Sequence, residues 1–244
     1  MNAEFEGFIK DYFNDVPQLF EDIKFLERRR NLKLLSQLYH DKNEINFYSW
    51  ISEMRFGLFF DNFCSELRHE ERIDNKTPDW TIIINEQKIL AEVLRVNTPE
   101  NEMNEQIQLI KKIKKLQKDD PSLRFKMHSK VKIMSSEYLY GAQDKLIKKE
   151  NNYREITLKY NLPFIICVAC TLDTFLGGLD FFDFLIGHAK KGFFYSDVNF
   201  GKNITGILIK SYSNEFIYFH NEHADNKLNS TNMKFFETLF YRET

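Results

Sequence analysis

The sequence predicts an α/β protein in which helices pack around a mixed sheet. The chain has 244 residues, of which 43% are hydrophobic and 29% charged, as in ordinary soluble globular proteins. Apolar positions with helical spacing alternate along the chain with short apolar runs typical of strands. No internal repeat or low-complexity linker interrupts this order. We therefore expect one α/β domain at residues 45–244, preceded by a helical extension at residues 1–44.

The first half of the chain begins with helices and continues into a pair of strands. Apolar side chains recur at helical spacing through residues 4–40, which predicts two amphipathic helices separated near Pro17. Residues 45–66 have the pattern of a third helix. Two apolar strands then follow at residues 79–85 and 88–96, and the short polar stretch between them predicts a tight turn.

The second half alternates between the two kinds of element. The continuous apolar run at residues 163–169 is typical of a central strand that is covered on both faces. The remaining patterns predict helices at 100–118, 140–160, 175–189 and from about 232, and strands at 125–134, 205–210 and 215–219.

The sequence indicates a cytosolic protein that contains reduced thiols. Its first residues are acidic, and no apolar run is long enough to cross a bilayer. Three cysteines fit a reducing compartment. Cys167 and Cys170 have zinc-like spacing, but residues three apart in a strand point to opposite faces of the sheet. We therefore interpret them as core thiols.

Two acids stand at positions that suit a metal ion. Asp79 starts the first of the paired strands, and Glu92 lies inside the apolar run of the second. Burying an unpaired carboxylate costs several kcal/mol, so this arrangement calls for a cationic partner. Mg²⁺ binds one or two carboxylates and completes its coordination with waters and substrate oxygens. Asp79, Glu92 and the carbonyl of Val93 form the predicted site, and Glu53 lies on a largely apolar helix before it.

The spacing of these residues resembles a known nuclease signature. Pro78-Asp79, twelve intervening residues and then Glu92-Val93-Leu94 is similar to the motif of the PD-(D/E)XK nuclease superfamily, which includes restriction endonucleases and repair nucleases.

The order of elements extends this resemblance over roughly residues 46–170. In that superfamily a helix bearing a glutamate precedes the motif, and a helix and a further strand follow it. Glu53 lies on the helix before the motif, and residues 145–153 and 161–168 match the later helix and strand.

The resemblance implies both a fold and an activity. The fold is a restriction-endonuclease-like α/β/α sandwich. The activity is an endodeoxyribonuclease that depends on Mg²⁺ or Mn²⁺, of a restriction or phage-defence type. DNA would be the partner, and many such enzymes act as homodimers. Asp79 and Glu92 would hold the metal, and Glu53 would assist a second metal or a water.

One position departs from the pattern. The superfamily has a lysine where this chain has Leu94. That lysine orients or activates the attacking water and stabilises charge on the phosphate. Some divergent members supply it from the following helix. Lys145 is our first candidate for this role and Lys149 the second, because they share one helical face, whereas Lys148 points about 60° away from Lys145.

Basic residues are concentrated in one stretch of the chain. Residues 108–160 contain 14 Lys or Arg against six Asp or Glu, although the whole chain has a net charge of −2. Such asymmetry indicates either a basic face that binds phosphates or two solvated helix faces. The side chains that we expect to contact nucleic acid are Lys126, Lys130, Lys132 and Lys148.

A non-catalytic interpretation remains open beside the nuclease. Leu94 favours a degenerate nuclease fold that binds nucleic acid or a partner protein. Each acid also has a structural interpretation. Asp79 can be a turn residue after proline, and Glu92 can pair with Arg95 or with a helix lysine. Glu53 can lie on the wet face of its helix.

Overall fold

Six strands form one mixed sheet in the computed structural model, which describes residues 16–35, 44–96, 112, 116, 137–170, 178–186, 192–195, 201–211 and 215–239. The strands lie in the order of the sequence: β1 (Glu66–His69), β2 (Trp80–Ile84), β3 (Gln87–Val96), β4 (Phe164–Cys170), β5 (Gly206–Lys210) and β6 (Phe216–His220). The β3–β4 and β4–β5 pairs are parallel, and the other pairs are antiparallel. The predicted α/β class and mixed sheet are confirmed.

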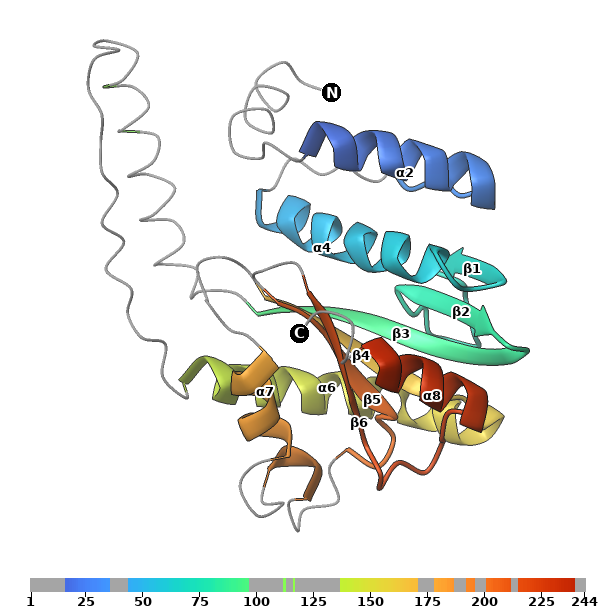
Figure 1. Ribbon diagram of the computed structural model, residues 1–244, viewed down its shortest axis with the longest axis vertical. Helices are drawn as coiled ribbons and strands as arrows, with labels where there is room; N and C mark the ends of the chain where they lie inside the picture. Colours follow the sequence, from blue (N-terminus) through green and yellow to red (C-terminus); the bar gives the residue numbers. More distant parts are fainter. Residues whose placement is uncertain are drawn as a thin grey trace.

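Helices cover both faces of this sheet (Figure 1). On one face, α4 (Glu44–Asp61) lies between the sheet and α2 (Val16–Arg30), and α8 (Ser230–Leu239) shares the same hydrophobic core. The other face buries a second core beneath α6 (Glu137–Tyr160), α7 (Gly178–Leu185) and the short 3₁₀ helix η1 (Phe193–Tyr195). The sheet therefore lies between helices on both faces, and α2, on the outer side of α4, belongs to the same core as the sheet.

A two-residue hairpin sets the register between β2 and β3. Asn85 and Glu86 both have positive φ angles, 46° and 64°, as a type I′ turn requires. This turn pairs Ile84 with Gln87 and, at the far end of the hairpin, Trp80 with Ala91. The next residues along the two strands, Asp79 and Glu92, therefore lie side by side.

The structure corrects the expected helix at residues 45–66. Helix α4 ends at Asp61, and Glu66–His69 form β1, an edge strand paired with β2. Arg30 fixes the chain where it leaves the helix, because its guanidinium donates to the carbonyls of Cys64 and Ser65 at 2.9 and 2.8 Å. These long-range bonds override the helical pattern of the sequence.

Two other helices end earlier than the sequence predicts. The chain leaves α2 at Asn31, whose φ of 55° is left-handed and ends the helix well before residue 40. Helix α7 covers Gly178–Leu185 of the expected 175–189. Apart from Lys112 and Leu116, the expected helix at 100–118 and strand at 125–134 lie outside the described residues.

The central strand behaves as the sequence predicts. All seven residues of β4 are buried, and Cys167 and Cys170 enter the two opposite cores. Among the described helices, none is both long enough and apolar enough to span a bilayer.

Candidate active site

Asp79 lies where β2 begins and closes a gap in the backbone pairing of β3. Because β2 starts at Trp80, opposite Ala91, it offers no backbone carbonyl to the amide of Val93. The Asp79 carboxylate takes that place, and its Oδ2 accepts a hydrogen bond from the Val93 amide at 2.6 Å. Asp79 is thus more than a turn residue: its side chain is tied to the strand that carries Glu92.

Glu92 is buried, with 1% of its surface exposed, and three donors surround its carboxylate. Its Oε1 accepts from the backbone amide of Asp79 at 3.3 Å and from the Tyr153 hydroxyl, which also lies 3.0 Å from the carbonyl of Thr77. Its Oε2 accepts from the ammonium of Lys149. Glu92 therefore pairs with a helix lysine. This pairing fits Glu92 as a structural ion-pair residue, and it equally fits Glu92 as a metal ligand beside a catalytic lysine.

Helix α6 brings a lysine and a tyrosine into contact with Glu92. Lys149 and Tyr153 are one turn apart on the face that covers β3, so both side chains reach Glu92. Lys145, one turn earlier, is exposed and makes no hydrogen bond or ion pair with Asp79 or Glu92 among the described contacts. Leu94 is 7% exposed and packs in the core beneath α6. The geometry thus favours Lys149 over Lys145.

Glu53 approaches the pair of acids from helix α4 on the other side of the sheet. Its carboxylate contacts Nε2 of His69, an edge-strand residue that the sequence analysis did not single out. The His69 ring packs on Trp80, with ring centroids 4.7 Å apart, and the Trp80 indole donates to the Glu53 carbonyl at 3.0 Å. The sequence patterns gave no reason to single out His69, because the predicted helix ended at residue 66 and residues 67–69 were assigned to no helix or strand.

The acids perturb one another's protonation. Burial, followed by the charges of Glu92 and Glu53, raises the pKa of Asp79 to about 8, although Lys149 and the Val93 amide oppose the shift. Burial works against a charged Lys149, but Glu92, Asp79 and Glu53 outweigh it and raise the pKa of that ammonium. Burial and the bond to Glu92 raise the pKa of Tyr153, so its hydroxyl stays protonated.

This charge balance bears on whether the site fits a divalent cation. Three carboxylates face one ammonium, and burial together with the charges of Glu92 and Glu53 raises the pKa of Asp79. Two neighbouring carboxylates and a backbone carbonyl are donors that Mg²⁺ accepts. Within the described part of the chain, however, no three His, Cys, Asp or Glu side chains gather into a metal cluster. The donors therefore fit a metal that keeps several waters or substrate oxygens.

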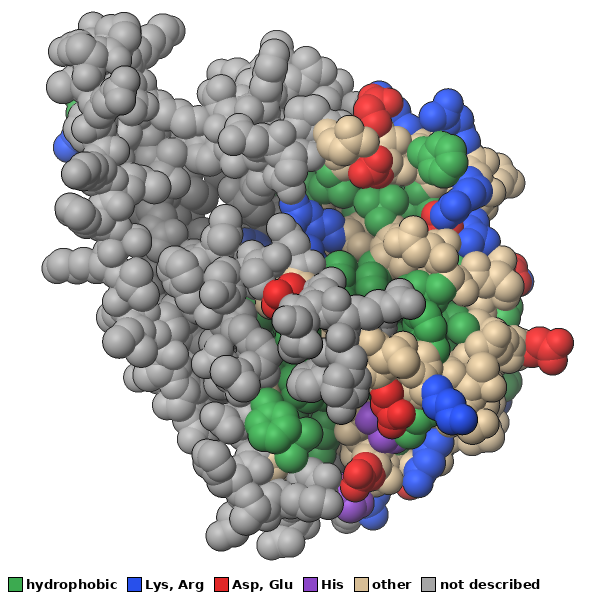
Figure 2. Space-filling view, in the orientation of Figure 1, with side chains coloured by type: hydrophobic (Ala, Val, Ile, Leu, Met, Phe, Trp, Pro, Cys, Tyr) green, Lys and Arg blue, Asp and Glu red, His purple; other side chains and the backbone are tan. Residues whose placement is uncertain are grey.

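Most of the residues predicted to contact nucleic acid are not described by the structure. Lys126, Lys130 and Lys132 lie outside the described residues, whereas Lys148 is exposed on α6. On the face drawn in Figure 2, the described Lys and Arg side chains are interspersed with Asp and Glu. The basic face predicted from residues 108–160 stays a prediction.

Comparison of the chain with known proteins gives no match. No protein-family model, curated protein or solved structure matches the chain. The arguments for function therefore depend on the residues and geometry described above.

Proposed function

We propose that this protein is a divalent-metal-dependent endodeoxyribonuclease of the PD-(D/E)XK type, in which Asp79, Glu92 and Lys149 form the reaction site. The single observation that carries the proposal is the meeting of these three side chains. Asp79 and Glu92 adjoin at the ends of a hairpin, and the Lys149 ammonium contacts Glu92 from helix α6. A lysine at this place supports the idea that the role of the motif lysine has moved from residue 94 to the helix.

The residues can be given distinct roles in phosphodiester hydrolysis. Asp79 and Glu92, with the carbonyl of Val93, would hold Mg²⁺ or Mn²⁺. The metal would polarise the scissile phosphate and lower the pKa of a bound water. Lys149 would hold that water in line and stabilise negative charge on the phosphate oxygens. Tyr153 would position Glu92 by the hydrogen bond that it donates.

The architecture supports the same proposal at a coarser level. A glutamate-bearing helix, an antiparallel hairpin with the two acids, a following helix and a parallel strand occur in the order that the restriction-endonuclease-like fold requires. Glu53, in contact with His69, would assist a second metal or a water. A restriction or phage-defence role and a homodimer that cuts both strands belong to this proposal.

The test is cleavage of plasmid DNA by purified protein with Mg²⁺, with Mn²⁺ and with EDTA. Asp79→Asn and Glu92→Gln should abolish metal-dependent nicking, and Lys149→Met should slow it by roughly 10²-fold or more, the scale of a lost acid–base group. Glu155→Gln, an exposed change on the same helix, should cut at least as well as the wild type. Circular dichroism checks that each variant is folded. Wild-type cleavage by folded Asp79→Asn or Glu92→Gln would refute the site.

A specific observation also favours a second candidate, a non-catalytic module that binds nucleic acid or a partner protein. Both oxygens of Glu92 already accept hydrogen bonds from protein donors, and Leu94 is packed in the core. Such a site can be a closed structural network. A protein whose melting temperature does not respond to Mg²⁺ or Mn²⁺, and which cuts no DNA, would be this module.

A further inference from the structure

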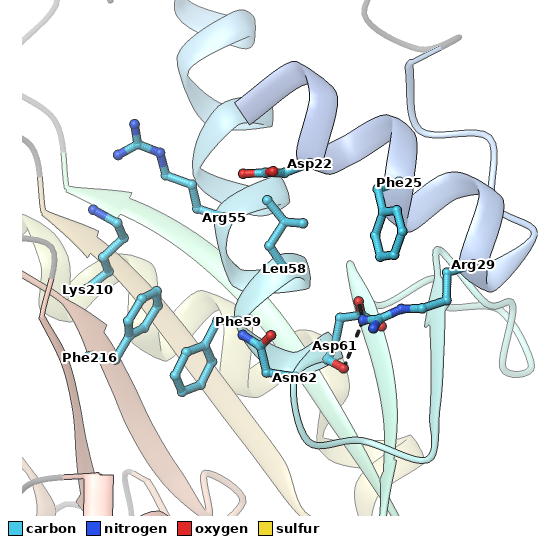
Figure 3. Close-up of a pocket in the computed structure, with 10 residues that line it drawn as sticks. All are labelled: Asp22, Phe25, Arg29, Arg55, Leu58, Phe59, Asp61, Asn62, Lys210 and Phe216. Atoms are coloured by element: carbon cyan, nitrogen blue, oxygen red, sulfur yellow. Dashed lines mark hydrogen bonds and ion pairs between the residues drawn. The ribbon is translucent and has the colours of Figure 1, made fainter. Parts of the chain in front are cut away.

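Helix α4 carries two largely buried acids, and the protein satisfies one of them completely. Asp61, at the end of the helix, lines a pocket that α2, α4 and β6 share, and Figure 3 shows its ion pair with Arg29. Its other oxygen accepts from Nε of Arg30 at 2.6 Å. Both oxygens of Asp61 are thus paired with arginines, so this acid is structural.

Glu53, about two turns earlier on the same helix, is satisfied only in part. Its Oε1 contacts Nε2 of His69, whereas its Oε2 has no hydrogen-bond or ion-pair partner among the described residues. The Glu53 side chain is 19% exposed, against 5% for Asp61. One oxygen of Glu53 is therefore held by the protein, and the other is open to a ligand that the protein does not supply.

His69 holds Oε1 of Glu53 in a fixed place. An ionised carboxylate only accepts hydrogen bonds, so Nε2 of His69 carries the hydrogen and donates it. The imidazole is itself fixed, because its side chain is 6% exposed and its ring packs on Trp80 with centroids 4.7 Å apart. His69 and Trp80 are also cross-strand partners in the β1–β2 pair.

Trp80 fixes the backbone of Glu53 as well. Its indole N–H donates to the Glu53 carbonyl at 3.0 Å. The ring lies directly against α4 at Gly57, where a Cβ would stand 2.2 Å from the indole. Glycine inside a helix costs about 1 kcal/mol relative to alanine, so a packing reason is expected for it. Here Gly57 lets helix and sheet approach closely enough for the indole bond.

This assembly lies beside the acids that we propose as metal ligands. The amide of Glu70, which follows His69, donates to the Asp79 carbonyl at 3.1 Å. After burial and the charge of Glu92, the charge of Glu53 is a further cause of the raised pKa of Asp79, so the two carboxylates lie within electrostatic reach of each other. The edge strand β1 thus places His69 next to the reaction site.

We propose that His69 is a positioning residue for Glu53, which it holds by Oε1 so that Oε2 is available to a second divalent cation. A cation is favoured over a water because three carboxylates face one ammonium here. The inference rests on the proposed function, since it takes Asp79 and Glu92 as ligands of the first cation. His69 acts through Glu53 and touches neither metal nor DNA.

Binding of Mn²⁺, followed by the electron paramagnetic resonance signal of the free ion, tests the proposal without DNA or cleavage. The wild type should bind two ions. His69→Phe keeps a ring on Trp80 but removes the donor, and it should weaken the second ion by roughly 10–100-fold, as should Glu53→Gln. His69→Gln, whose amide N–H can still reach Glu53, should stay within about threefold of the wild type.

The controls separate positioning from a general effect on the fold. Glu155→Gln removes an exposed charge on α6 and should bind both ions like the wild type. Combining Glu53→Gln with His69→Phe should weaken the second ion no more than either change alone, because His69 acts through Glu53. Urea denaturation checks that each variant is folded. If His69→Phe does not fold, His69→Asn replaces it, since its amide is too short to stand where Nε2 lies.

The outcomes distinguish this proposal from the nuclease. A wild type that binds fewer than two ions, or a folded His69→Phe that binds both as the wild type does, overturns the role of His69. A His69→Gln as weak as His69→Phe overturns it too. A wild type that binds two ions but cuts no plasmid DNA refutes the nuclease and leaves the role of His69 intact.

Discussion

Among single residues, Asp79 shows most clearly which contacts the structure reveals beyond those that the sequence predicts. The sequence alone placed this acid on a strand next to the strand of Glu92. The apolar residues predicted the two strands, and the polar residues between them predicted the turn. Pattern could not show that Asp79 accepts from the amide of Val93 at 2.6 Å or that three carboxylates share one ammonium. The hydrogen bond depends on the side-chain geometry at the start of β2, and the charge cluster depends on how helices α4 and α6 pack on the sheet.

The choice between the two helix lysines was open for the same reason. Lys145 and Lys149 share a helical face, so helical periodicity cannot separate them. The separation comes from where α6 lies along β3, which brings residues 149 and 153 over Glu92 and leaves residue 145 exposed.

The raised pKa of Asp79 makes the stability of the protein depend on pH. Its pKa lies at about 8 in the folded protein and near 4 in an unfolded chain, so the folded state holds the proton more tightly. The contribution to the free energy of unfolding is therefore full below about pH 4 and is lost as the pH rises to about 8. We expect Asp79→Asn, a neutral mimic, to gain stability relative to the wild type across this window.

Urea denaturation at pH 5 and pH 9 measures the effect. Relative to the wild type, Asp79→Asn should have a higher free energy of unfolding at pH 9 than at pH 5. Mg²⁺ at pH 9 should then stabilise the wild type more than the variant, because only the ionised carboxylate binds the cation. Parallel pH profiles for the two proteins would contradict the assigned electrostatics.

At the scale of elements, the strongest periodic patterns were the most reliable. The charged helix α6, the buried strand β4 and the hairpin β2–β3 lie close to their expected positions. The missed strand β1 is four residues long and polar, and its structure comes from pairing with β2 and from the hydrogen bonds of Arg30. Both contacts join segments that are not adjacent in the sequence, so a local sequence pattern cannot predict them.

The hairpin turn offers a prediction at this scale. Glu86 is exposed and has a φ of 64°, a conformation that costs an L-residue free energy and costs glycine none. Glu86→Gly creates the Asn-Gly pair that type I′ turns prefer. We expect it to raise the free energy of unfolding by roughly 0.5–1 kcal/mol in urea denaturation. The same change at the exposed helical residue Glu155 should instead lower it by about 1 kcal/mol, and equal effects at both sites would count against the turn argument.

For the whole molecule, charge distribution links the fold to its expected partner. The chain carries a net charge of −2, yet residues 108–160 hold 14 Lys or Arg against six Asp or Glu. If these cations share one face, that face would bind a polyanion while the rest of the protein repels it, which would orient the complex. The order of the sheet's elements from β2 to β6 could be predicted, although strand β1 was missed. The direction in which the basic segment faces could not, because it depends on how that segment packs, and Lys130 lies outside the described residues.

DNA binding measured against salt concentration tests this charge argument. Contacts to phosphates release counterions, so the affinity should fall steeply between about 50 and 200 mM salt. Reversing Lys130 and Lys132 to Glu should weaken binding to all DNA sequences about equally and reduce the salt slope, because phosphate contacts carry no sequence information. Lys234→Gln on α8 serves as the control for a general change in charge. An affinity that does not depend on salt, or a double reversal without effect, would exclude this segment from the DNA-binding surface and favour a protein partner.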